Sequence, residues 1–337
     1  MDRHSLNRGS RGPGRAERII IDDPSGVSRA RRRAEELARH AEIPSQRVGE
    51  WAIAVTEAGT NLVRHAKGGG LVLGSAPGVV EMWALDEGPG IRDVGWALRD
   101  GSTTHVGSAG LGLGAIRRIC DVADLCSSEG EGTVLYAGIG ASPDVCGLAL
   151  PQDGYEVSGD TFSFRREGAL ISALTFDGLG HGQPAFEAAQ RAHSAFQDTP
   201  ISVDPETALS EIDGALKGGR GGVGTVIRVT PEGIVASGVG NIDARLVALD
   251  GREQRLAPRP GTLGSNLPRL VQLRGDLEHP ALGVMTSDGF TVRWSSKRYQ
   301  MLLQRPVGLF VGVLLLHARR GRDDAGVLVF RIVPEEP

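Results

Sequence analysis

The most constraining feature of this sequence is a largely apolar segment, residues 169–176, that runs directly into the turn Asp177-Gly178-Leu179-Gly180-His181-Gly182. Its length and composition predict a buried strand that places the Asp177 carboxylate at its end. The glycines leave the backbone bare, so that a carbonyl oxygen such as that of Gly178 can approach a cation closely. One aspartate cannot hold a metal ion by itself, so this turn calls for further carboxylates from elsewhere in the chain.

Three other acidic turns are candidates for that role. Each lies at the edge of a predicted strand or beside a glycine: Ser158-Gly159-Asp160, Ser287-Asp288-Gly289 and Asp323-Asp324-Ala325. An isolated Asp-Gly pair is usually only a turn. Four separated carboxylates at strand ends, however, suit a pair of hard divalent cations bridged by water. We therefore expect these turns to meet in the folded chain.

Together with Gly238-Val239-Gly240-Asn241, these ordered motifs resemble the SpoIIE/RsbX branch of the metal-dependent (type 2C) serine/threonine phosphatases over about residues 147–337. The resemblance implies an αββα sandwich that binds two Mn²⁺ or Mg²⁺ ions. The metal ligands that it implies are Asp160, Asp177, the carbonyl of Gly178, Asp288 and Asp323, and the catalytic residues among them are Asp177, Asp288 and Asp323.

The same resemblance assigns expectations to neighbouring residues. Asp323 is preferred to Asp324 as the ligand, and Asp324 is expected to support the site from behind. His181 is interpreted as a loop residue, and Arg220 as a solvated loop arginine and not a phosphate ligand. Gly326 stands where many relatives carry threonine, and it is expected to loosen its loop.

The N-terminal half has its own polar pattern on a predicted helix that begins near Ser45. The apolar stripe of that helix consists of Val48, Trp51, Ala52, Val55 and Leu62. Glu57, Asn61 and His65 recur every four residues on another face. For an isolated helix this would indicate only a solvated polar stripe. A predicted strand at residues 79–85 and two glycine motifs downstream favour a binding site instead.

These motifs resemble the GHKL ATP-binding fold, in particular the RsbT/RsbW-like serine kinases, over about residues 17–140. The glycine motifs are Asp86-x-Gly88-x-Gly90 and Gly110-x-Gly112-x-Gly114, the second of which runs into a helix. In this reading Asn61 is the Mg²⁺ ligand, Asp86 accepts the adenine amino group, and Glu57 orients or deprotonates the attacking hydroxyl. The glycines present backbone N–H groups to the phosphates of ATP, and residues 101–108 form a lid.

Length and composition set the outer limits. At 337 residues the chain is long enough for two α+β domains; we expect a disordered tail at 1–16, the GHKL domain at 17–140 and the phosphatase domain at 147–337. The net charge of −4 argues against nucleic acid as the main partner. The longest apolar run, residues 307–316, is shorter than the roughly 20 residues that a membrane helix needs. With no apolar signal segment at the N-terminus, the expected location is the cytoplasm.

The resulting hypothesis is a bifunctional partner-switching regulator. Its phosphatase domain would act on a STAS-type anti-sigma-factor antagonist, and its ATP-binding domain would phosphorylate a serine of a partner. The alternative is that the GHKL domain only binds a sigma factor or antagonist, with ATP as a structural ligand.

Overall fold

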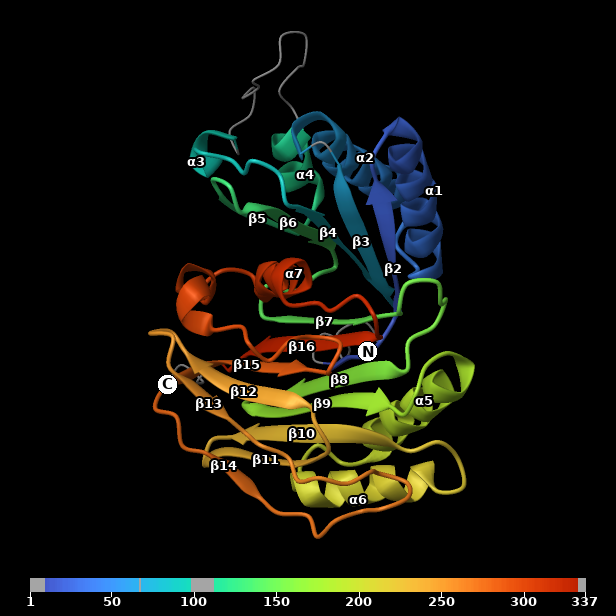
Figure 1. Ribbon diagram of the computed structural model, residues 1–337, viewed down its shortest axis with the longest axis vertical. Helices are drawn as coiled ribbons and strands as arrows, with labels where there is room; N and C mark the ends of the chain where they lie inside the picture. Colours follow the sequence, from blue (N-terminus) through green and yellow to red (C-terminus); the bar gives the residue numbers. More distant parts are fainter. Residues whose placement is uncertain (1–9, 67, 98–111, 333–337) are drawn as a thin grey trace. The chain divides into compact units, whose positions relative to one another are not determined.

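The computed structural model describes residues 10–66, 68–97 and 112–332 (Figure 1). The chain forms two compact units. The N-terminal unit comprises residues 14–144 and 305–317, and the C-terminal unit comprises the described residues of 1–13, 145–304 and 318–337. Both units combine helices with antiparallel sheets, which confirms the α+β class. In the described residues no helix is long and apolar enough to cross a membrane.

The N-terminal unit is built on a five-stranded antiparallel sheet with the order β2-β3-β4-β6-β5. Its strands are β2 (Arg15–Ile21), β3 (Gly69–Ala76), β4 (Val79–Asp86), β5 (Val122–Ser128) and β6 (Gly132–Ile139). Its main helices are α1 (Pro24–His40), α2 (Ser45–Asn61), continued by the π-helical turn η1 (Leu62–Ala66), and α4 (Gly112–Ile119), with a short α3 (Val94–Ala97). Helix α1 begins at Pro24 because the Asp23 carboxylate accepts the N–H groups of Ser25 and Gly26, 2.8 and 3.0 Å away.

Helix α7 (Val307–His317) completes this unit, although it comes from the C-terminal part of the sequence. It packs against β4, β5 and β6. Gly308 and Gly312 allow the close approach: a Cβ at Gly312 would lie 2.5 Å from Val134 Cγ1, and one at Gly308 would overlap the Tyr136 ring. The indole Nε1 of Trp83 donates to the Gly308 carbonyl at 2.8 Å. This helix, which contains the longest apolar run of the sequence, therefore covers the sheet that carries the predicted ATP-binding motifs.

The C-terminal unit contains two antiparallel sheets. One has the order β1-β8-β9-β10-β11-β14 and the other β13-β12-β15-β16-β7. The first consists of β1 (Ser10–Arg11), β8 (Asp160–Glu167), β9 (Leu170–Gly178), β10 (Gly222–Thr230), β11 (Gly233–Val239) and β14 (Leu273–Gly275). The second consists of β7 (Val145–Leu150), β12 (Asp243–Ala248), β13 (Glu253–Arg255), β15 (Pro280–Thr286) and β16 (Ala325–Arg331).

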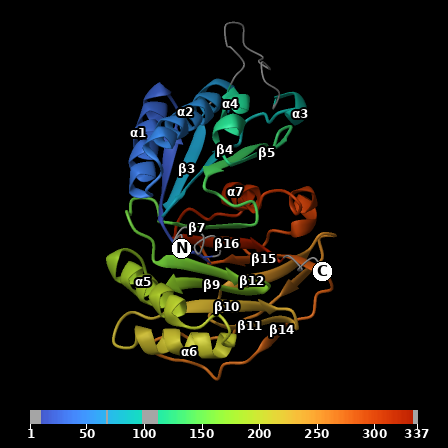
Figure 2. The ribbon, with the colours of Figure 1, turned by 180° about the vertical axis from the view of Figure 1, so that it is seen from behind.

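The core of the C-terminal unit lies between these sheets, where Phe162 and Phe164 of the first meet Leu328 and Phe330 of the second. Helices α5 (Gln183–Asp198) and α6 (Pro205–Leu216) pack side by side on the other face of the first sheet (Figure 2). A 3-10 helix, η2 (Ser296–Leu302), follows the loop after β15. Ser10 and Arg11, which the sequence places in a disordered tail, form β1 against β8, and β2 already begins at Arg15.

Candidate active site and nucleotide site

Two of the predicted metal ligands face each other across a strand pair. Asp160 begins β8, Asp177 lies near the end of β9, and the two are direct register partners. The Gly178 N–H extends the pairing by donating to the Gly159 carbonyl at 3.0 Å. The apolar segment before Asp177 is buried, as predicted. The strand pair therefore brings both aspartates to the same edge of the sheet.

The turn that contains Asp288 is tied to the same edge by its neighbour Ser287. The Ser287 hydroxyl donates to Asp160 Oδ2 at 2.6 Å and accepts the Gly326 N–H at 2.9 Å. The Ser287 N–H donates to the Gly326 carbonyl at 2.9 Å. This serine thus joins the second sheet to the first at the carboxylate cluster.

The two adjacent acids near the C-terminus have different surroundings. The Asp324 carboxylate is 3% exposed and accepts the N–H groups of Gln152 and Gly159, 2.7 and 2.6 Å away. Asp324 therefore holds the turn that leads into Asp160. Asp323 is exposed, and one of its oxygens accepts the Asp324 N–H at 3.0 Å. This arrangement leaves Asp323 as the acid of the pair that can reach a ligand.

Gly326 does not loosen this region. Its N–H and carbonyl are both bonded to Ser287, and a Cβ at this position would lie 3.0 Å from the Cβ and 3.1 Å from Oδ2 of Asp160. The expectation of a loosened loop was wrong, because glycine here provides the space that the Asp160 carboxylate occupies.

The carboxylates affect one another strongly. Burial first, and then the negative charges of Asp160, Asp288 and Asp323, raise the pKa of Asp177 to about 9. Burial also raises the pKa of Asp160 to about 7, although the Ser287 hydrogen bond acts in the opposite direction. The pKa of Asp323 is raised as well: the residue is exposed, but its carboxyl is partly desolvated, and the charges of Asp288 and Asp324 act in the same direction. A cluster of this kind becomes fully ionised at neutral pH only if cations neutralise it.

Among the described residues, the carboxylates do not form a closed cage around a single metal ion. Within the described ranges, no three histidine, cysteine or acidic side chains converge on a point where they could enclose one ion. Mg²⁺ typically keeps several waters and is held by one or two carboxylates. The opposed pair Asp160 and Asp177, with Asp288 and Asp323 nearby, suits two such ions.

Asn241 is a site residue to which sequence reasoning gave no role. Its side-chain N–H donates to Asp288 Oδ2 at 3.0 Å and so orients that carboxylate. The Gly-Val-Gly-Asn motif was the available signal, but it gave no indication of which carboxylate the asparagine would meet. Arg220 lies beside the turn after Asp177, where its Nη1 donates to the Leu179 carbonyl at 3.1 Å. The His181 ring packs against the Tyr155 ring at a tilt of 60°, with 4.7 Å between the ring centroids.

The N-terminal unit brings together the predicted nucleotide-binding residues of α2 and α4. A Cβ at Gly112 would lie 3.2 Å from Glu57 Oε2 and 3.5 Å from both the nitrogen and the oxygen of the Asn61 amide. The glycine at the start of α4 therefore lies against both polar side chains of α2. Gly114 is buried in the same helix. Gly110 and the expected lid at 101–108 lie outside the described residues.

Asp86 stands at the end of β4, as predicted, and is largely buried. Its Oδ1 accepts the Gly88 N–H at 2.8 Å, and burial raises its pKa. A Cβ at Gly88 would meet the backbone of Ala66 at 3.0 Å, so this turn packs directly on the end of η1. Gly90 adopts a φ of 74°, which favours glycine.

One protein-family model matches the N-terminal part of the chain. Residues 20–139 match the family model of the histidine kinase-like ATPase domain, HATPase_c_2. A search of curated proteins gave no match.

Solved structures resemble the chain over a little more than half of its length. A chain described with the bacterial stressosome, a modular system adapted to control secondary messenger signalling, is 24% identical, with a TM-score of 0.46 and coverage of 55% of this chain and 97% of its own. RsbX in complex with magnesium is 19% identical, with a TM-score of 0.49 and coverage of 56% and 94%. The SiaA-PP2C domain of Pseudomonas aeruginosa is 21% identical, with a TM-score of 0.44 and coverage of 56% and 86%.

The chain therefore joins an N-terminal domain that matches the histidine kinase-like ATPase family model to a C-terminal α+β unit built on two antiparallel sheets.

Proposed function

We propose that this chain is a cytoplasmic partner-switching regulator in which a metal-dependent protein serine/threonine phosphatase is fused to an ATP-binding serine kinase domain. The observation that carries the phosphatase proposal is the meeting of four acidic turns at one sheet edge, with Asp160 and Asp177 in direct register. The proposed substrate is the phosphoserine or phosphothreonine of a STAS-type antagonist. This choice of substrate is supported by the order of the acidic motifs along the sequence, which resembles that of the SpoIIE/RsbX branch.

In the proposed reaction, Asp160, Asp177, the Gly178 carbonyl, Asp288 and Asp323 hold two Mn²⁺ or Mg²⁺ ions. Bound ions would supply a water of lowered pKa and positive charge opposite the phosphate. The protein's own contribution is positioning. The Ser287 hydroxyl fixes one oxygen of Asp160, the Asn241 amide fixes one oxygen of Asp288, and the backbone contacts of Asp324 hold the turn before Asp160.

For the N-terminal unit we propose Mg-ATP binding, with Asn61 as the metal ligand and Asp86 as the acceptor of the adenine amino group. Glu57 is proposed as the base for transfer to a partner serine. Its carboxylate lies close to Gly112, at the start of the helix whose N-terminus would face the phosphates. In the competing possibility this unit binds a sigma factor or antagonist without transferring phosphate.

The phosphatase test uses the purified full chain with a phosphoserine protein or an aryl phosphate. Activity should require Mn²⁺ or Mg²⁺, and Asp177→Asn should abolish it while the protein stays folded. Asp250→Asn is the matched control, because Asp250 is exposed and pairs with Arg252 of its own turn. Full activity in excess chelator would rule out the metal mechanism.

The kinase test follows the mass of a candidate partner incubated with ATP. Glu57→Ala should stop phosphate transfer and leave the phosphatase reaction intact, whereas Asp288→Asn should let the phosphorylated partner accumulate. Transfer at the parent level by Glu57→Ala would leave the binding-module function as the better account of this unit.

A further inference from the structure

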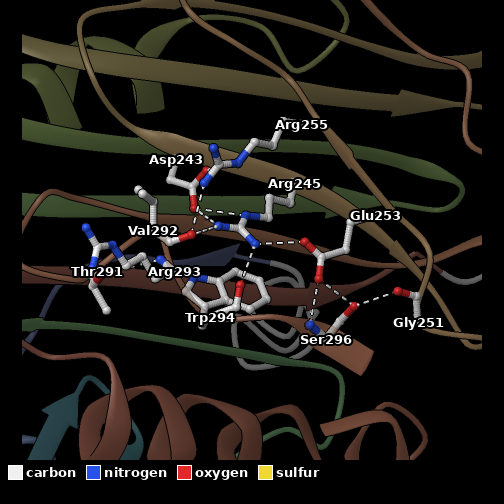
Figure 3. Close-up of polar contacts among 10 residues, drawn as sticks. All are labelled: Asp243, Arg245, Gly251, Glu253, Arg255, Thr291, Val292, Arg293, Trp294 and Ser296. Carbon is white, nitrogen blue, oxygen red and sulfur yellow. Dashed lines mark hydrogen bonds and ion pairs between the residues drawn. The ribbon is translucent and has the colours of Figure 1, made fainter. Parts of the chain in front are cut away.

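Arg245 of β12 lies at the centre of a buried polar cluster in the C-terminal unit (Figure 3). Its side chain is almost fully buried, and all three of its nitrogens are used. Nε and Nη2 contact Asp243 at 2.9 and 2.7 Å, and Nη1 contacts Glu253 at 2.7 Å. The guanidinium also lies over the Trp294 ring, 3.9 Å from its centroid.

The same guanidinium holds the loop that leaves Asp288. It donates to the carbonyl of Val292 at 2.7 Å and to that of Trp294 at 3.0 Å. Backbone hydrogen bonds to residues 318–320 and to Gly326 hold residues 287–291, and the guanidinium holds the next part of the same loop, residues 292–294. Glu253 extends the hold by accepting the Ser296 N–H at 2.6 Å.

Asp243, another member of this cluster, lies close in sequence to Asn241. Asp243, which pairs with two nitrogens of Arg245, opposes Thr286 in the register of β12 and β15. Asn241 lies two residues before Asp243 and donates to Asp288. Arg245 therefore joins the two segments that meet at the Asp288 carboxylate, the start of β12 and the loop after β15.

The cost of burying these charged groups indicates that the cluster fixes the backbone and does not mainly stabilise the fold. Burying charged groups is costly, and replacing them by apolar groups of similar volume is often neutral or stabilising. A planar guanidinium that binds two carboxylates and two carbonyls at once instead specifies one arrangement of the backbone. That arrangement includes the metal-binding turn.

We propose that Arg245 is a positioning residue for divalent-cation binding at Asp288. It acts by fixing residues 292–294 of the loop after Asp288 and by fixing Asp243 at the start of β12, two residues after Asn241. This inference rests on the proposed metal-dependent function. The sign of the effect separates positioning from simple electrostatics. Removing a positive charge near a cation site should by itself strengthen cation binding, whereas loss of positioning should weaken it.

The test is titration calorimetry of Mn²⁺ into the full chain. Arg245→Met should weaken Mn²⁺ binding about 10- to 100-fold, the range for changes to groups that orient metal ligands. Arg245→Lys keeps the charge but cannot reach both carbonyls, and it should also weaken binding. If circular dichroism shows that Arg245→Met does not fold, the Mn²⁺ affinity of Arg245→Lys tests the positioning role instead. Arg252→Met is the matched control, because Arg252 is half-exposed on the turn between β12 and β13. The Arg252→Met protein should bind Mn²⁺ with the affinity of the parent.

Parent-like or tighter Mn²⁺ binding by both Arg245 variants would overturn the positioning role and leave the proposed function standing. If the parent itself bound no Mn²⁺, both the proposed function and this inference would fail. With the parent reaction on an aryl phosphate as reference, the variants should lose activity at low Mn²⁺ and regain most of it at saturating Mn²⁺.

Discussion

The packing of α7 on the sheet of the N-terminal unit makes a sharp prediction for Gly308→Ala. In an ordinary helix, replacing glycine by alanine is stabilising by about 0.5–1 kcal/mol. At Gly308 the new Cβ would overlap the ring of Tyr136. That ring cannot move aside easily, because it is fully buried, lies 5.5 Å from Trp83 and bonds through its hydroxyl to Glu81 at 2.6 Å.

The magnitude follows from setting these two effects against each other. Overpacking a buried site typically costs about 1–3 kcal/mol. After the gain in helix propensity is subtracted, the net destabilisation of the N-terminal unit by Gly308→Ala is about 0–2.5 kcal/mol, with a central value of about 1 kcal/mol. For a unit of this size, about 1 kcal/mol corresponds to a fall of about 3–4 °C in its unfolding midpoint.

The assay compares the parent, Gly308→Ala and Gly49→Ala by thermal unfolding, followed by tryptophan fluorescence and calorimetry. Gly49 is an exposed residue within α2, and an added Cβ there meets nothing within 4 Å. Gly49→Ala should therefore raise the midpoint by a degree or more. If Gly308→Ala raised the midpoint as Gly49→Ala does, the packing of α7 on Tyr136 would be refuted.

Three further predictions concern the nucleotide site, the domain boundary and the carboxylates. Gly112→Val should weaken Mg-ATP binding at least as much as Asn61→Ala, because its side chain would intrude on the Asn61 amide, and unchanged calorimetric affinity in both would contradict the assigned site. A fragment of residues 17–140 lacks α7 and leaves Trp83 uncovered, so it should unfold at a lower temperature than the same unit in the full chain; an equal midpoint would show that α7 is dispensable. The raised pKa of Asp177, about 9, means that the folded metal-free protein holds a proton that the unfolded chain releases near pH 4, so in chelator its stability should fall as the pH rises toward 9. Asp177→Asn should flatten that fall, and a midpoint that rises with pH in the parent would contradict this.

Local rules made much of the candidate site predictable. A buried apolar strand ending in an acid, followed by glycines, gave Asp177 its place at a sheet edge. Helical spacing put Glu57 and Asn61 on one face, and the contact of both with Gly112 agrees with the motif order. Patterns of this kind are visible in sequence because they depend on the geometry of one strand or one helix.

Other features depended on partners far apart in the chain. Asp323 and Asp324 are chemically identical neighbours. The family resemblance preferred Asp323 as the ligand, and the structure supplies the physical reason, because the N–H groups of Gln152 and Gly159 hold Asp324 inward. The contacts of Asn241 with Asp288 and of Arg245 with the loop after it likewise join segments that are about 50 residues apart.

Helix α7 shows both what the sequence determined by itself and what only the tertiary structure decided. Its apolar residues cover every side, so the sequence determined that it would be buried but provided no polar face to indicate its orientation or its partner. Shape decided the partner: Gly308 and Gly312 leave space that Tyr136, Val134 and Trp83 fill. Complementarity of this kind exists only between surfaces that are already folded, and for that reason only the tertiary structure assigned α7 to the N-terminal unit.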